Sequence, residues 1–232
     1  PVRYEWIVED ETCHKRASLR SADIKAIAER CSVAIEDFDT LATSRFERFV
    51  DKLASGEGVR IAFMGDSFVE GDIVTCDLRE ELQSRFGGRG AGFIPADIPF
   101  ATVRKSIKRT SANWKTYSVM KPKEAPEALR ERLFVSGYLA EGRAGATTRW
   151  QAPTSHASLH SCTQARILLI SRDTSRVEVV LGDTLRNEFM IAGDERVREI
   201  YVEGPVDDIR LRVVEGSVMC YGATMEGNGG VT

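Results

Sequence analysis

The sequence predicts an α/β domain interrupted by an inserted antiparallel β-sandwich. Residues 39–95 alternate between helical and strand-like patterns, whereas short β-rich runs separated by turn residues recur after residue 96. Only one strong candidate strand precedes that point. A parallel sheet needs several strands joined by crossover helices. We therefore expect an α/β domain that is incomplete in this chain, which would be a fragment of a longer protein.

The first expected elements are helices around one buried strand. A short helix is predicted from about Ser21, and apolar residues spaced i, i+3, i+4, i+7 predict an amphipathic helix over about 39–55, which Gly56 would cap. Residues 59–64 (VRIAFM) form a short apolar run typical of a buried strand, broken by Gly65. A further helix is expected to end at Gly87. This order is typical of the start of an α/β domain.

The region after residue 96 is expected to be an antiparallel sandwich, because runs such as 176–181 and 209–213 alternate as half-exposed strands do. The expected domains are 1–95 for the start of the α/β domain, 96–221 for the inserted sandwich, and 222–232 for a glycine-rich loop that returns to the α/β domain. The expected strands are 116–120, 132–139, 165–171, 176–181, 188–191, 199–202, 209–214 and 218–221.

Composition excludes several classes of partner. The 32 basic and 35 acidic residues are mixed along the chain, so the formal net charge of -3 creates no field that favours nucleic acid or an anionic membrane. No apolar run approaches the roughly 20 residues of a membrane helix. The sequence contains no phosphate-binding loop, dinucleotide fingerprint, EF-hand or zinc spacing, so no cofactor and no metal are expected.

The five cysteines form no C-x-x-C pair. Buried or free thiols are predicted, and a disulfide between Cys13 and Cys31 is the alternative if the protein is exported.

Ser67 is the candidate nucleophile. It follows Gly65 and Asp66 at the expected junction between a buried strand and a helix, where an open α/β sheet places its ligands. Its backbone N–H could face a developing oxyanion, and the helix would add its N-terminal dipole. Gly65 permits the sharp turn, and Asp66 is expected to cap the helix. The segment lacks the second glycine of G-x-S-x-G, so it is not the elbow of ordinary α/β-hydrolases.

Residues 59–95 resemble the first sequence block of the SGNH/GDSL hydrolases, particularly the bacterial peptidoglycan O-acetylesterases. The shared features are the apolar strand, Gly65-Asp66-Ser67, the acidic Glu70-Gly71-Asp72, the helix over 78–86 and the glycine-rich close at 87–95. Those esterases carry a β-sandwich, similar to carbohydrate-binding modules, after this block. The resemblance implies a flavodoxin-like three-layer α/β domain and a serine esterase of the periplasm or cell envelope that removes O-acetyl groups from a cell-wall or other glycan.

The resemblance also implies a histidine base from an Asp-x-x-His motif and oxyanion donors from a glycine and an asparagine, none of which can be placed. His14 lies upstream of Ser67, and His156 and His160 lack the glutamate of H-E-x-x-H, so a loop with incidental histidines is expected. The missing groups are expected beyond Thr232 or in a second chain. A serine without a base is a poor nucleophile, so this chain alone is predicted to be inactive.

The alternative is a non-catalytic glycan-binding or cell-envelope assembly module with a degenerate SGNH remnant.

Three weaker signals have structural interpretations. Glu70 and Asp72 are expected at the N-terminus of the helix after Ser67. The basic run 104–109 could contact an anionic polymer, but a solvated strand or loop is favoured. The aromatic residues of the β-rich part are expected to pack inside the sandwich; they are Trp114, Tyr117, Tyr138 and Trp150.

Overall fold

The computed structural model describes residues 5–6, 17–18, 38–40, 44–99, 104, 106–133, 136–153 and 159–232. The chain divides into two compact units, Pro1–Arg48 and Phe49–Thr232. In the first unit, the two-residue strands β1 (Glu5–Trp6) and β2 (Ala17–Ser18) pair antiparallel. The short helix expected from about Ser21 lies outside the described residues.

Helix α2 (Arg45–Ala54) confirms the amphipathic helix expected over 39–55, although it begins later. Its start is set by Ser44 and Glu47. The hydroxyl of Ser44 accepts from the N–H of Glu47 at 2.9 Å, and the carboxylate of Glu47 accepts from the N–H of Ser44 at 3.1 Å. This reciprocal capping box satisfies two backbone donors that have no partner inside the helix. Gly56 follows the helix at φ +73°, a left-handed conformation that suits glycine.

The strand expected over 59–64 forms only at its first residue. Val59 makes a parallel bridge with Val231, supported by a bond from the N–H of Thr232 to the carbonyl of Val59 at 2.9 Å. Residues 62–64 are exposed. A parallel strand is buried only when neighbouring strands and helices cover it, and the described residues supply one neighbour. They therefore contain a single parallel pairing, not a three-layer α/β sheet.

The single helix expected after Ser67 is two helices, α3 (Ser67–Glu70) and α4 (Thr75–Phe86), joined by a turn at 71–74. The break falls at Asp72, whose φ of +59° is incompatible with a continuous right-handed helix. Helix α4 ends at Gly87 as predicted, with φ +75°.

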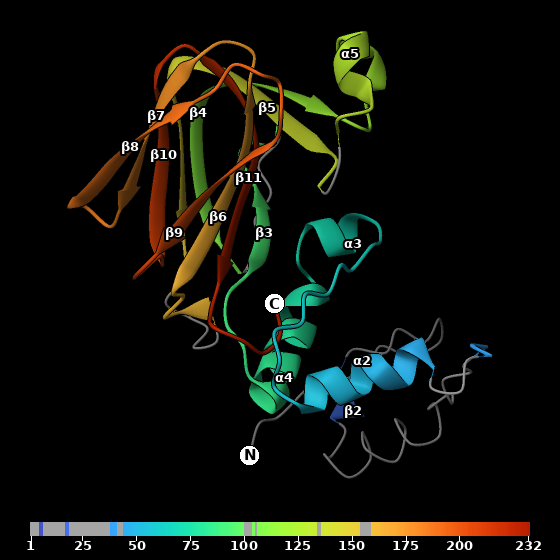
Figure 1. Ribbon diagram of the computed structural model, residues 1–232. Coiled ribbons are helices and arrows are strands. Elements are labelled where there is room, and N and C mark those ends of the chain that lie inside the picture. Colours follow the sequence, from blue (N-terminus) through green and yellow to red (C-terminus); the bar gives the residue numbers. More distant parts are fainter. Residues whose placement is uncertain are drawn as a thin grey trace. The chain divides into compact units, whose positions relative to one another are not determined.

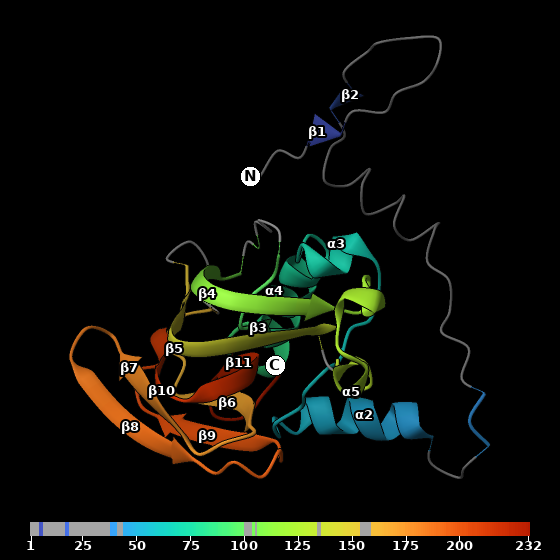
Figure 2. The same ribbon diagram turned by 90° about the horizontal axis from the view of Figure 1, so that it is seen from above.

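The β-rich part is an antiparallel, sandwich-like sheet, in agreement with the predicted antiparallel insert (Figures 1 and 2). Its strand order is β8-β7-β10-β5-β11-β6-β9, with β4 paired to β5 and β3 paired to β11. The 3-10 helix η1 (Pro122–Glu124) and helix α5 (Glu127–Arg130) lie between β4 and β5. The strands are β3 (Gly92–Pro95), β4 (Lys108–Ser118), β5 (Tyr138–Gln151), β6 (Gln164–Ser171), β7 (Ser175–Leu181), β8 (Leu185–Ile191), β9 (Arg198–Glu203), β10 (Asp208–Glu215) and β11 (Ser217–Glu226).

Seven of the eight expected strands are confirmed within β4 and β6 to β11. The strand expected over 132–139 is wrong, because β5 starts only at Tyr138 and then runs to Gln151. Strand β3 lies in the glycine-rich segment 87–95, where no strand was expected. Strand β11 continues past Tyr221 to Glu226 because residue 222 is a glycine: a Cβ there would lie 2.0 Å from the carbonyl oxygen of Ile94.

The main core lies between the inner faces of the strands, and β5 links its two halves. Residues 147–151 of β5 pair with β10, and residues 140–143 pair with β11. Trp150 is fully buried, and its indole N–H donates to the carbonyl of Pro95 at 3.2 Å. Tyr117 and Tyr138 are also buried, and Trp114 packs against the core. The aromatic packing prediction is confirmed. None of the helices that the structure describes is long and apolar enough to cross a membrane.

Cys76, Cys162 and Cys220 are free and buried, as predicted, whereas Cys13 and Cys31 lie outside the described residues. Burial raises the pKa of both Cys162 and Cys220 to about 12. Because the thiolate is the reactive form, we expect neither thiol to react with iodoacetamide at pH 8 until the protein is unfolded, as measured by peptide mass mapping.

The raised pKa values of Cys162 and Cys220 also determine how the stability of the folded protein changes with pH. The folded-state pKa of each thiol lies above the unfolded value of about 8.5. Each contribution to stability is therefore complete below about pH 8.5 and is lost as the pH rises toward 12. Labelling of the folded protein at the rate of an exposed thiol would contradict this description.

Candidate active site at Ser67

Ser67 is exposed and is the first residue of α3. Residues 60–65, which follow the Val59–Val231 bridge, form no helix or strand. Asp66 occupies the N-cap position of α3. Its carboxylate accepts from the N–H of Phe68 at 3.0 Å, which confirms Asp66 as a helix cap. Within the described chain, neither the hydroxyl nor the backbone N–H of Ser67 has a hydrogen-bond partner. Both groups are therefore available to a ligand.

Gly65 is required by close packing, not by its backbone angle. It is absent from the residues with positive φ. A Cβ at this position would lie 2.5 Å from Cγ2 of Val69 in α3. Because real Cβ atoms do not approach this closely, any larger residue at this position would require the Val69 side chain to move.

The helix after Ser67 is shorter than the sequence suggests. Helix α3 contains four residues, so few peptide dipoles add along its axis. The dipole contribution expected from the helix is therefore small for α3, and the main contribution of this turn to an oxyanion site would be the unbonded N–H of Ser67 itself.

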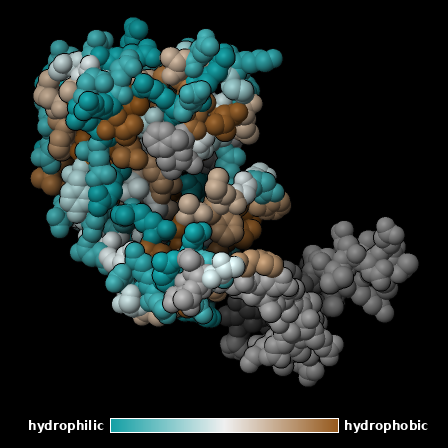
Figure 3. All heavy atoms as spheres, turned by 45° about the vertical axis from the view of Figure 1, so that its right-hand side comes forward, coloured by the Kyte–Doolittle hydropathy of each residue, from teal (hydrophilic) through white to brown (hydrophobic). Residues whose placement is uncertain are grey.

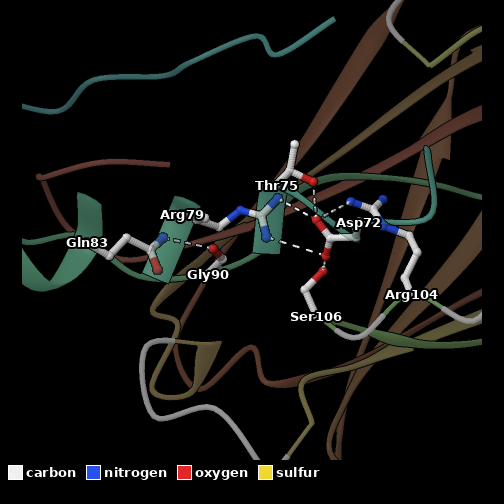
Figure 4. Close-up of polar contacts among 7 residues, drawn as sticks. All are labelled: Asp72, Thr75, Arg79, Gln83, Gly90, Arg104 and Ser106. Carbon is white, nitrogen blue, oxygen red and sulfur yellow. Dashed lines mark hydrogen bonds and ion pairs between the residues drawn. The ribbon is translucent and has the colours of Figure 1, made fainter. Parts of the chain in front are cut away.

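A buried carboxylate fixes the turn after α3 (Figure 4). Asp72 has no exposed surface and accepts from the hydroxyl of Thr75 at 2.5 Å, from the guanidinium of Arg79 at 3.1 Å and from the hydroxyl of Ser106. Arg104 lies 3.9 Å from the same carboxylate. Asp72 lies just before α4 and bonds the side chain of Thr75, the first residue of that helix, so its expected place near a helix N-terminus is correct for α4 and not for α3. It also connects α4 to the segment before β4.

The basic run 104–109 is not a solvated segment throughout. The side chain of Arg104 is mostly buried and Ser106 is fully buried, because both face Asp72. Burial lowers the pKa of Arg104, and the Asp72 carboxylate partly offsets that effect. Among the described residues of the run, Lys108 alone is exposed as expected, while Arg109 is half-buried. The sequence carried no signal for this contact, since Asp72 and Ser106 are 34 residues apart.

Two further contacts hold the Ser67 segment against the sandwich. Arg60 donates to the carboxylate of Glu226, the last residue of β11, at 2.6 and 3.2 Å. The hydroxyl of Tyr138, at the start of β5, donates to Glu70 at 2.5 Å. Glu70 lies in the first turn of the four-residue helix α3, as predicted, and it also bonds a strand. Together with Asp72, these contacts fix the chain on both sides of Ser67.

The described residues place no histidine beside Ser67. His160 lies in the sandwich part, where its carbonyl accepts from Arg89 at 3.2 Å. His14 and His156 lie outside the described residues. Across the described ranges, no group of three or more His, Cys, Asp or Glu side chains could hold a metal ion.

Helix α4 exposes apolar side chains and buries polar ones. Cys76 and Gln83 are buried, and Arg79 points toward Asp72. The Gln83 amide donates to the carbonyls of Gly90 and Val231 at 2.9 and 3.1 Å (Figure 4). We call the exposed large hydrophobic residues between 63 and 78 the apolar face; they are Phe63, Met64, Phe68, Ile73, Val74 and Leu78. Figure 3 shows hydrophobic residues at the surface when the side of the molecule that carries α3 is turned forward.

No family model and no curated protein matches this chain. Among solved structures, a peptidoglycan O-acetylesterase is 20% identical over 79% of this chain and 49% of its own length, with a TM-score of 0.54. The two share a fold over that part, and this chain spans about half the length of the esterase. A family 29 carbohydrate-binding module solved with mannohexaose and a family two carbohydrate esterase from Cellvibrio japonicus match at 7% identity each. They cover 59% and 53% of this chain, and 91% and 34% of their own lengths, with TM-scores of 0.36 and 0.30.

Proposed function

We propose that the chain contributes the nucleophile to a serine esterase of the SGNH/GDSL type, which removes O-acetyl groups from a cell-wall or other glycan in the periplasm or cell envelope. The observation that carries the proposal is the exposed Ser67 with an unbonded N–H, at a turn fixed on both sides by Arg60, Glu70 and Asp72. The shared fold with a peptidoglycan O-acetylesterase supports the choice of reaction class.

In this mechanism, the Ser67 oxygen attacks the acyl carbon while a histidine base takes its proton. The Ser67 N–H donates to the oxyanion that forms, and the alcohol of the sugar leaves. Water then attacks the acyl-enzyme and releases acetate. The base and the remaining oxyanion donors would lie beyond Thr232 or in a second chain. The test is whether loss of the Ser67 hydroxyl abolishes hydrolysis of a simple acetyl ester by the protein expressed from its complete gene.

The apolar face supports the proposal that further α/β structure packs against this part of the chain. Val59 and Val231 already form one parallel bridge, and parallel strands are normally covered on both faces. We expect Val74→Gln/Leu78→Gln to reduce binding of the dye ANS by this 232-residue chain and to prevent correct folding of the protein from the complete gene.

Lys52→Gln/Lys121→Gln is the control for that variant, because it changes two exposed residues away from the apolar face. Normal folding of the complete protein with both apolar residues replaced would rule out burial of this face.

The second candidate is a non-catalytic glycan-binding or envelope assembly module. It is favoured by the well-packed sandwich and by the absence of a histidine beside Ser67 in the described ranges. The two functions differ in one measurement. A binding module retains glycan in a pull-down without Ser67 and hydrolyses no acetyl ester, whatever the length of the chain.

A further inference from the structure

The outer face of strands β4, β5 and β10 carries an open groove of about 330 Å³. Along β5 its lining extends from Gln151 to Thr147, which corresponds to about 14 Å of strand. The floor contains small side chains such as Thr110 and Ala112, so a ligand can approach the sheet closely. An open trough of this length accepts an extended chain more readily than a compact small molecule.

The strand register gathers basic side chains in this groove. Arg149 pairs with Arg210 across β5 and β10, and Lys108 pairs with Gln151 across β4 and β5. Side chains at paired positions point to the same face about 5 Å apart. Lys108 and Arg210 flank β5 two residues out of line, so their Cα atoms lie roughly 12 Å apart. Arg212, which pairs with Thr147, extends the basic row along β10.

Acidic residues neutralise only part of this charge. Asp208 accepts from Arg149 at 2.8 Å and from Gln151 at 3.1 Å, and Asp183 lies 3.9 Å from Arg149. In the part of the chain that the structure describes, the other three cations of the row form no ion pair; they are Lys108, Arg210 and Arg212. Arg212 lies opposite Glu178 of β7, which is paired with Arg186, so Lys108 and Arg210 are the two cations of the row without an acidic cross-strand partner. Two arginines directly opposite each other reduce stability. Asp208 offsets part of that repulsion through Arg149, and an anion beside Arg210 would offset more of it.

The lining also restricts the chemistry of the ligand. It contains no aromatic side chain, so the groove offers no flat surface on which a neutral sugar ring could stack. It offers instead charge-assisted donors, which bind carboxylates strongly, and the hydroxyl and amide groups of Thr110, Thr147 and Gln151. Such a surface matches a polymer that carries both carboxylates and hydroxyls.

We propose that this groove binds a carboxylate-bearing polysaccharide. The choice of a sugar polymer rests on the proposed function, whereas the choice of an anionic one rests on the groove. The site is separate from Ser67: Arg210 would hold the acidic chain by a carboxylate and Lys108 would bind at the edge strand, while Arg149 stays bonded to Asp208.

The test is isothermal titration calorimetry of the 232-residue chain with polygalacturonate and with its fully methyl-esterified form, which keeps the chain but loses the charges. We expect binding of the acid form only. Lys108→Ala/Arg210→Ala is expected to weaken it by about tenfold or more, because each lost bond is charge-assisted. Lys123→Ala/Arg143→Ala removes two exposed charges outside the groove and should change the affinity less than about twofold.

Three results would overturn the inference. They are no binding of polygalacturonate, equal binding of the methyl-esterified form, and equal loss of affinity in the two double variants, which would indicate attraction of any polyanion. Hydrolysis of a simple acetyl ester by the protein from the complete gene is expected to be unchanged by Lys108→Ala/Arg210→Ala. A failure of the groove is thereby distinguished from a failure of the Ser67 proposal.

Discussion

Replacing Ser67 with alanine is expected to lower kcat/KM for a simple acetyl ester by about 10⁴-fold or more in the protein expressed from its complete gene. The nucleophile, its base and the oxyanion donors act as one unit, so removing the attacking oxygen eliminates the acyl-enzyme route almost entirely. Ser67 is exposed and its hydroxyl bonds nothing in the described chain. The substitution therefore removes no structural contact, and the melting temperature should stay the same.

The matched control is Ser84→Ala, which removes another exposed serine hydroxyl, from helix α4, without touching the Ser67 turn. Its activity should equal that of the parent protein. A fluorophosphonate probe should label the peptide that contains Ser67 and leave the Ser67→Ala protein unlabelled. Full activity of Ser67→Ala would eliminate the esterase proposal and leave the glycan-binding module as the better account.

The β-rich part was the more predictable half of the fold. Strands such as β7 and β10 alternate between buried and more exposed residues, so the two-residue period of a β-strand can be read in their sequences. Strand β5 escaped prediction because its middle, from Glu141 to Ala146, is rich in glycine and alanine and contains charge. Its partners β4, β10 and β11 hold it in the sheet by long-range pairing, which a local pattern cannot reveal.

The nucleophile of the candidate site and its helix cap could be predicted from the sequence, but the residues that hold them in place could not. The sequence identifies Ser67 and its cap Asp66, because both lie within one turn. The residues that position this turn come from distant segments: Ser106 before β4, Tyr138 in β5 and Glu226 in β11. The sequence placed Glu70 and Asp72 near a helix N-terminus, but it carried no signal for the distant contacts that they make with Tyr138 and Ser106.

Asp72→Ala is expected to reduce the free energy of unfolding by about 3 kcal/mol. The carboxylate is fully buried and bonds two hydroxyls and Arg79, so its removal leaves the mostly buried side chains of Arg79 and Arg104 without their counter-charge. Alanine also tolerates φ +59° less well than aspartate. Urea denaturation of the 232-residue chain measures the change.

Two variants separate these causes, since Asp72→Asn keeps the shape and the tolerance of a left-handed backbone but loses the charge. We expect Asp72→Asn to reduce the free energy of unfolding by less than Asp72→Ala does. Asp77→Ala removes an exposed carboxylate from α4 and should change stability by no more than about 0.5 kcal/mol. If Asp72 connects the Ser67 turn to the sandwich, Asp72→Ala will also accelerate hydrogen exchange at the amides of Gly71 and Ile73, which bond back to Ser67 and Phe68. Unchanged exchange at those amides, with stability within 0.5 kcal/mol of the parent, would show that the Ser67 turn holds its position without the buried carboxylate.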